Sequence, residues 1–396
     1  MQVLRSTIAA RVAGMELSVI KEMAIRAAQT PGAVSLAWGV PSFATPEPIR
    51  AAVKRALDED ADIGRYSLPD GITALRAAIV LRHRAATGVL VDADKHVLVS
   101  AGNMQAMSTM LRVLLEVGDE VIVTDPGFCS HVQQIELAGG IPRYWRLDES
   151  RGWQLDMSAL PALIGERTRA IVLVNPSNPT GRIFARDDLL ALAALARRHG
   201  LTILIDDPYS DFVYAPAEAL FNLASASEFS DHIVYMFTFS KAYAMTGWRL
   251  GYMVMPERLK HEAVKVHDAE LICAPRVSQE AGLAALALQP QPQLKFARVI
   301  AARREQICAR LDALPALFSY QRPQGAYYVF PRILAPHADS REFALRLLRE
   351  AGVSVTPGGG FGPGGEHHVR MAFCVDEQSI DRAFDRINAW HAGRRP

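Results

Sequence analysis

The chain has 396 residues, of which 50% are hydrophobic and 21% are charged, as is typical of a globular protein. Its 43 Lys and Arg and 42 Asp and Glu leave a formal net charge of +1, which argues against a nucleic-acid or membrane-surface partner. This length exceeds that of one ordinary core and predicts two domains.

The N-terminal region, Met1 to Ala28, is interrupted by charged residues and lacks the apolar stretch of a signal peptide. No apolar run approaches the ~20 residues that a membrane span needs. We therefore expect a cytoplasmic enzyme. Metal sites and disulfides are not expected, because the cysteines form no CxxC pair and lie far apart. They are Cys129, Cys273, Cys308 and Cys374.

From about Val97 to Met255, short β-branched runs alternate with longer amphipathic ones. Runs with little polar alternation predict strands covered on both faces, and strand–helix–strand order predicts a mostly parallel sheet wrapped by helices. The clearest helices are Met104–Glu116 and Arg186–His199. The strands are predicted at His96–Ser100, Glu120–Thr124, Ala170–Asn175, Leu201–Asp206, Ile233–Thr238 and Leu250–Met255.

The remaining chain predicts long helices followed by a smaller α+β domain, which the N-terminal segment joins. Residues 46–285 are expected to form the large domain, and residues 1–45 together with 286–396 the small one. Helices are predicted at Pro256–Leu271, Val277–Leu288, Leu294–Leu314, Arg341–Ala351 and Glu377–Ala392, and strands at Ala326–Phe330, Val353–Thr356 and His368–Phe373.

The first candidate site segment is the turn at Gly102, where a strand ends and a helix begins with Asn103 and Met104. Free backbone N–H groups at a helix start suit an anion, and glycine lets a phosphate approach closely. Alone the signal is weak, because many strand–helix turns contain a glycine for geometry only.

Two further segments follow predicted strands. The prolines around Asn178 fix an extended, turning backbone that holds its amide toward the strand ends. Asp206 ends an apolar strand, where a carboxylate is costly unless it is paired. A protonated ring nitrogen would be such a partner, and Tyr209 could reach the same place. The alternative for Asp206 is a helix cap.

The fourth segment places Lys241 three residues after the strand that ends at Thr238. Among apolar neighbours an amine loses hydration, which favours the neutral form that attacks an aldehyde. Arg249, Thr238 and Ser240 together can satisfy a phosphate. All four segments follow strands of one predicted parallel sheet, at whose carboxyl edge ligands bind. Their coincidence is stronger evidence than any of them alone.

These segments resemble the class I/II aminotransferases of fold type I, the family of α/β enzymes that use pyridoxal 5′-phosphate (PLP). The resemblance runs through nearly the whole chain. Further matches are Gly39 with Val40 and Pro41, the segment around Tyr66, and the C-terminal stretch that leads to Arg370.

The resemblance implies a role for each of these residues. Lys241 would form the Schiff base with PLP and shuttle the proton, and Asp206 would keep the ring nitrogen protonated. Asn178 and Tyr209 would bind the ring's phenolic oxygen. Arg370 would bind the substrate α-carboxylate, with Gly39 and Asn178 nearby. Phe128 would stack on the ring, and the phosphate would meet Gly102, Asn103, Met104, Thr238, Ser240, Arg249 and Tyr66 of the partner subunit, which implies a homodimer.

The sequence departs from the family at a few positions. Ser42 stands where many members carry aspartate, and Asp207 with Pro208 replaces a glutamate and an apolar residue. Met104 stands where some aspartate-specific relatives carry a lysine that contacts the substrate's distal carboxylate. The methionine indicates apolar, aromatic or broad amino-acid specificity. Arg276 is a weaker candidate for that contact.

The expected activity is ping-pong transamination between an α-amino acid and a 2-oxo acid. A PLP-dependent β-eliminating C–S lyase on the same fold shares Lys241, Asp206 and Arg370, so these motifs do not separate the two. A PLP-binding transcription regulator is not expected, because the Gly39 loop starts too early for a preceding DNA-binding domain.

Overall fold

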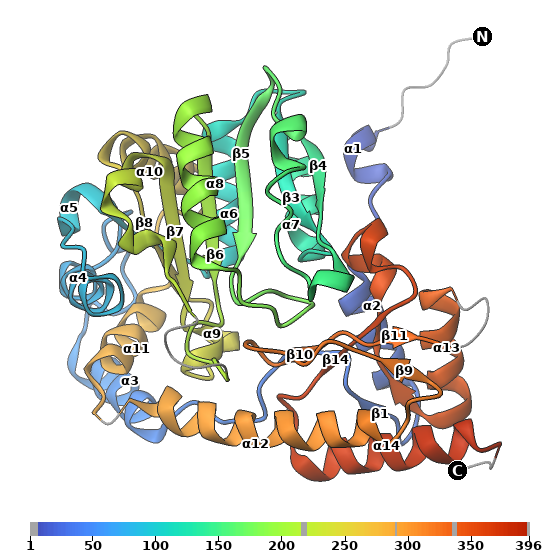
Figure 1. Cartoon of the computed structure of the whole chain (residues 1–396). Coiled ribbons are helices and arrows are strands. Elements are labelled where there is room, and N and C mark those ends of the chain that lie inside the picture. Colours follow the sequence, from blue (N-terminus) through green and yellow to red (C-terminus); the bar gives the residue numbers. More distant parts are fainter. Residues whose placement is uncertain (1–6, 215–219, 290, 335–338, 394–396) are drawn as a thin grey trace.

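The computed structural model describes residues 7–214, 220–289, 291–334 and 339–393 (Figure 1). Its centre is a seven-stranded sheet with the order β2-β8-β7-β6-β5-β3-β4. Only β8 runs antiparallel to its neighbours, so the mostly parallel sheet is confirmed. The strands are β2 (Val97–Ser100), β3 (Glu120–Asp125), β4 (Ile141–Arg146), β5 (Thr168–Val174), β6 (Thr202–Asp207), β7 (Ile233–Thr238) and β8 (Gly251–Val254).

The sequence analysis does not predict the edge strand β4. Its six residues include Pro142 and two arginines, and only Trp145 is buried. An edge strand tolerates proline and charged side chains, since one of its sides has no partner strand. β4 therefore carries no apolar run by which it could be recognised.

Side chains of the sheet alternate between two covered faces. Val172, Leu204 and Val234 belong to an apolar cluster with α6, α7 and α10. Ile203 and Tyr235 belong to another cluster with α3, α4, α8 and α11. The helices are α3 (Glu47–Glu59), α4 (Thr73–Thr87), α5 (Ala93–His96), α6 (Asn103–Leu114), α7 (Cys129–Leu137), α8 (Arg186–His199), α9 (Phe239–Ala242), α10 (Glu257–Leu271) and α11 (Arg276–Ala287).

A third apolar cluster lies around small C-terminal sheets. β1 pairs in parallel with β12, so the N-terminal segment lies against this part. The long helix α12 extends from beside α11 to α14 (Figure 1). The elements of this part are α2 (Val19–Gln29), β1 (Val34–Ser35), α12 (Pro292–Asp312), β9 (Phe318–Ser319), β10 (Tyr328–Val329), β11 (Arg332–Ile333), α13 (Ser340–Ala351), β12 (Val353–Ser354), β13 (Thr356–Pro357), β14 (Val369–Ala372) and α14 (Glu377–His391). The short helix α1 (Ala10–Ala13) contacts α7 instead. The domain boundaries stay a prediction.

The four cysteines are free and buried, as expected. Within the described ranges, every helix is too short or too polar to cross a lipid bilayer. The same residues contain no group of three His, Cys, Asp or Glu side chains that could hold a metal ion.

Candidate active site

The predicted site segments meet at one cavity of about 630 Å³ at the carboxyl ends of β5, β6 and β7. Residues from the N-terminal segment and from β14 complete its wall. Gly102 and Tyr66 are the predicted site residues that do not line it. Those that do are Gly39, Asn103, Met104, Phe128, Asn178, Asp206, Tyr209, Thr238, Ser240, Lys241, Arg249 and Arg370.

Lys241 lies in the short helix α9, directly after β7. Its Nζ donates a hydrogen bond of 2.8 Å to the carbonyl oxygen of Gly39. Burial lowers the pKa of the Lys241 ammonium to about 8, and the nearby cations Arg370 and Arg249 act in the same direction. A substantial fraction of this amine is therefore neutral near physiological pH, as a nucleophile requires.

Asp206 is buried at the end of β6 and points to the face that carries α6 and α7. Asn103 Nδ2 donates to its Oδ1 at 2.6 Å, and His131 Nε2 lies 3.0 Å from its Oδ2. These two contacts fix the orientation of the carboxylate. The Asn103 side chain is thus engaged with Asp206, although the sequence analysis places this residue at a phosphate. His131 was missed, because no motif distinguishes it from any other helical residue.

Gly102, Arg249, Thr238 and Ser240 form a cradle suited to an anion. Gly102 has a φ of +81°, and a Cβ there would lie 2.6 Å from a terminal nitrogen of Arg249, so this position requires glycine. Arg249 donates to the carbonyl oxygens of Thr246 (2.9 Å) and Ala101 (3.3 Å). The Thr238 and Ser240 hydroxyls lie 2.8 Å apart. With the N-terminus of α6, these groups can bind a phosphate.

Arg370 lies on β14 with only 1% of its surface exposed. One terminal nitrogen donates to Asn178 Oδ1 at 3.1 Å, and its Nε has no hydrogen-bond partner among the described residues. The guanidinium lies 4.3 Å from the ring centroid of Tyr328. A buried cation without a carboxylate partner is costly. The position is therefore prepared for an anionic ligand.

Aromatic side chains form much of the remaining wall. The hydroxyl oxygens of Tyr209 and Tyr328 lie 3.0 Å apart, and burial raises the pKa of Tyr209 well above its usual value. A Cβ on Gly39 would lie 2.0 Å from the Tyr328 hydroxyl, so a larger residue cannot replace this glycine without a shift. Phe128 packs edge to face against His131, with ring centroids 5.2 Å apart. Tyr328 was also missed, since nothing in its predicted strand indicates which residue faces the cavity.

Two residues from the sequence analysis lie elsewhere. Tyr66 is 75% exposed and does not line the cavity of its own chain. Its role toward a partner subunit stays a prediction. Arg276 forms ion pairs of 3.0 Å with Asp60 and with Glu280, so its charge is already neutralised.

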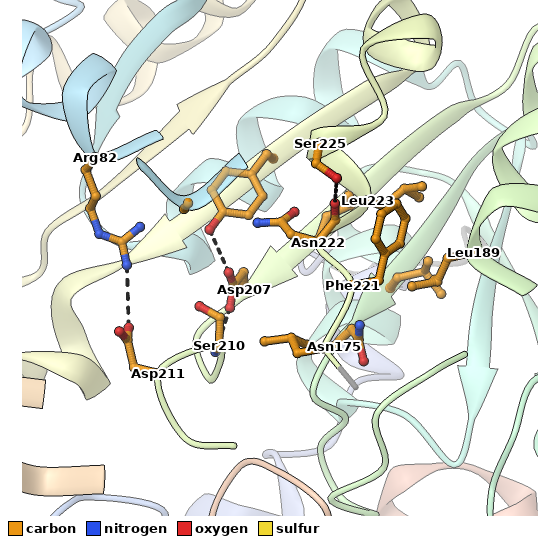
Figure 2. A pocket seen from close by; sticks show the side chains of 15 residues that line it. Arg82, Asn175, Leu189, Asp207, Ser210, Asp211, Phe221, Asn222, Leu223 and Ser225 are labelled. Atoms are coloured by element: carbon orange, nitrogen blue, oxygen red, sulfur yellow. Dashed lines mark hydrogen bonds and ion pairs between the residues drawn. The ribbon is translucent and has the colours of Figure 1, made fainter. Parts of the chain in front are cut away.

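A second cavity, of about 390 Å³, lies on the other face of β6 (Figure 2). Asp207 points into it and accepts a hydrogen bond of 2.6 Å from the Tyr235 hydroxyl. Arg82 lies 3.5 Å from Asp211 in an ion pair. The acidic residue that departs from the family pattern thus has a partner within the protein.

Comparison with known proteins agrees with this fold, which is that of the α/β enzymes of PLP fold type I. The profile of the family described as aminotransferase class I and II matches residues 31–387. The chain belongs to this family and is an aminotransferase.

Relatives of this chain include enzymes named for different substrates. An aspartate aminotransferase from Pyrococcus horikoshii is 33% identical over 96% of both chains. An aromatic-amino-acid aminotransferase from Thermococcus litoralis is 32% identical over 90% of this chain and 91% of the relative. The solved structure of Thermus thermophilus aspartate aminotransferase with maleate has a TM-score of 0.90 at 29% identity, and covers 97% of this chain and 99% of that chain.

Proposed function

We propose that the protein binds PLP at Lys241 and transfers the amino group of an α-amino acid to a 2-oxo acid by a ping-pong mechanism. One observation carries the proposal. Arg370, a buried cation without an acidic partner among the described residues, lines the same cavity as an amine whose pKa burial lowers to about 8. This pairing suits a ligand with a carboxylate at one end and an amino or carbonyl group close to it.

The residues of the cavity fit PLP. The cradle of Gly102, Thr238, Ser240 and Arg249 suits its phosphate, and Asp206 suits its ring nitrogen. Lys241 suits its aldehyde. When bound, PLP supplies the ring that accepts electrons from the substrate Cα.

The protein's own groups then orient the substrate and move its proton. Arg370 binds the α-carboxylate with a two-pronged contact, and Asn178, already hydrogen-bonded to Arg370, holds this guanidinium in place. Lys241 would take the proton from the substrate Cα and deliver it to C4′ of the cofactor. Asp206, oriented by Asn103 and His131, keeps a proton on the ring nitrogen.

The substrate range is proposed to be broad and to include apolar and aromatic amino acids. Met104 at the cavity wall is 41% exposed and cannot supply a charge to a distal carboxylate. The relatives' names include both aspartate and aromatic enzymes. We also propose a homodimer in which Tyr66, too exposed to serve its own chain, contacts the phosphate in the partner's site.

The test is a half-reaction of the PLP-loaded protein with single amino acids and no 2-oxo acid. We expect the visible absorption of lysine-bound PLP to give way to the spectrum of pyridoxamine phosphate, with one equivalent of 2-oxo acid released. Continuous release of ammonia and pyruvate from cysteine conjugates, with the visible absorption retained, would contradict transamination and indicate a lyase.

A further inference from the structure

The carbonyl oxygen of Gly39 accepts hydrogen bonds from two side chains. The Lys241 Nζ lies 2.8 Å from this oxygen, and the Tyr327 hydroxyl lies 3.2 Å from it. Gly39 is buried, and a carbonyl oxygen has two lone pairs, so both donors can be accepted at once. The proposed function gives Lys241 a part in the chemistry but assigns no role to Tyr327.

The Tyr327 ring is fixed by its surroundings and does not line the active-site cavity. The exposed fraction of Tyr327 is 0%, and its ring packs edge to face against Tyr209 and Phe212, with ring centroids 5.2 and 5.5 Å apart. The hydroxyl therefore cannot turn to solvent, and it lies behind the cavity wall rather than beside a bound substrate. Because the ring is fixed, its hydroxyl defines a fixed position for the Gly39 carbonyl oxygen.

The two donors to the Gly39 carbonyl differ in what the proposed reaction requires of them. The Lys241 amine leaves this oxygen when it bonds to the aldehyde of PLP, and it is free again once a substrate has taken its place. A buried carbonyl that loses its donor is costly unless a second donor remains. Tyr327 is the donor that remains, so the Gly39 carbonyl keeps its direction throughout the cycle and can accept the amine again.

We propose that Tyr327 is a positioning residue, whose hydroxyl holds the Gly39 carbonyl where that oxygen receives the free Lys241 amine. The inference rests on the proposed function and adds a residue to it. The hydroxyl also acts on the charge of the amine. Its hydrogen and the lysine ammonium both direct positive charge at one oxygen, so the hydroxyl disfavours the protonated amine. Loss of the hydroxyl should therefore raise the pKa of Lys241.

The test compares Tyr327→Phe with the matched control Tyr320→Phe in the cofactor-free protein. Each substitution removes one hydroxyl and keeps the ring, and the Tyr320 hydroxyl donates to the Cys308 carbonyl, away from the cavity. The rate at which dinitrofluorobenzene labels Lys241, followed by peptide mass spectrometry, reports the reactivity of the amine at each pH without any cofactor.

The expected result is a change in the pH profile of labelling. Because the pKa of Lys241 rises in Tyr327→Phe, its labelling rate should fall about threefold at pH 7 and equal that of the unaltered protein near pH 10. Burial raises the pKa of Tyr327 well above its usual value and that of Cys374 to about 11, so both stay protonated over this range. The charged or titratable groups that face Lys241 in all of these proteins are Asp206, Arg249, Arg370 and Cys374.

The half-reaction of the PLP-loaded protein with phenylalanine gives a second readout. Tyr327→Phe should lower kcat about fivefold, because the amine that carries the proton is less well placed, and leave KM within about twofold, because Arg370 is unchanged. Tyr320→Phe should change neither the half-reaction nor the labelling profile.

An unchanged labelling profile in Tyr327→Phe would overturn the inference. A fall by the same factor at every pH would overturn it as well, since that result indicates a general disturbance of the site. Failure of the unaltered protein with every amino acid would refute the proposed function instead, and the labelling profile would still decide whether Tyr327 sets the reactivity of Lys241.

Discussion

The two cavities on opposite faces of β6 differ in the partners of their charged side chains. In the cavity of Figure 2, Arg82 forms an ion pair with Asp211 and donates a hydrogen bond of 3.2 Å to the Tyr252 hydroxyl. In the active-site cavity, Arg370 and Lys241 donate to amide and carbonyl oxygens and form no ion pair with a described residue. Cavity size alone would not separate a binding site from a packing gap. Buried charges that lack a partner distinguish the two, because the free-energy cost of burying them is offset only when a ligand binds.

Neighbouring residues of one strand separate the two environments. Asp206 and Asp207 are consecutive in β6, and the strand's alternation directs them to opposite faces. Asp206 meets an amide and an imidazole that hold it toward the open cavity, whereas Asp207 is bound by Tyr235 and by the backbone N–H of Ser210. The comparison predicts that changes on the first face alter chemistry and changes on the second alter stability.

The largest effect is expected from Lys241→Ala. Loss of the amine should remove the visible absorption of lysine-bound PLP and lower the transamination rate by at least about 10³-fold, because both the nucleophile and the proton carrier are gone. Absorption spectra and steady-state rates measure both. Lys260→Ala is the control, since Lys260 is a buried lysine whose Nζ lies 2.9 Å from Asp70. A normal visible band in Lys241→Ala would place the covalent bond elsewhere.

Arg370→Gln should lower kcat/KM for amino acids by about 10²- to 10³-fold, as removing one partner of a desolvated ion pair costs several kcal/mol. The affinity for PLP should change little, because Arg370 is assigned to the substrate and not to the phosphate. Rates and a PLP titration of the cofactor-free protein provide the two measurements. Equal losses of substrate and PLP affinity would contradict the assignment.

A smaller effect is expected from pH on the capture of PLP by cofactor-free protein. Burial lowers the pKa of Lys241 to about 8, so its neutral fraction rises with pH and levels off above that value. The capture rate should increase about tenfold between pH 7 and pH 9. A lysine with the ordinary pKa of about 10.5 would instead give nearly a hundredfold rise without levelling off. Stopped-flow absorbance distinguishes the two curves.

The smallest effect on activity is expected from Arg82→Gln in the second cavity. The substitution leaves Asp211 without its cation, and the free energy of unfolding should fall by about 2 kcal/mol while kcat/KM changes by less than about twofold. Urea unfolding of the cofactor-free protein gives the first quantity. Arg82→Gln combined with Asp211→Asn should recover part of the lost stability. A large loss of activity in a stable Arg82→Gln protein would mean that the second cavity also serves the reaction.

Much of the large sheet could be predicted, because the sequences of its buried parallel strands are runs rich in β-branched residues. The helix predicted at Arg186–His199 has the same bounds in the structure, where acidic residues occupy its first turn and Gly200 ends it with a φ of +67°. The edge strand β4 could not be found, and the predicted strand Val353–Thr356 is divided between β12 and β13. Short or exposed strands depend on their neighbours more than on their own residues.

The site could be predicted where a residue follows a strand in a distinctive turn, as Lys241 and Asn178 do. It could not be predicted where a side chain acts only through tertiary proximity. His131, in α7, lies 75 positions before Asp206 in the sequence and contacts its carboxylate. Tyr328, in the C-terminal part, contacts the Tyr209 hydroxyl. The direction of the Asn103 amide was likewise set by the folded structure, since a residue at a helix start can use its backbone or its side chain.

The hydrogen bond between Lys241 and the Gly39 carbonyl connects the reactive nitrogen to a segment that is not part of the large sheet. That segment begins at β1, which pairs with β12. It also contains Trp38, whose ring lies against the Lys21 ammonium. Substitutions in this segment are therefore expected to change the position of the Lys241 amine. The strands of the large sheet would keep their structure in such variants.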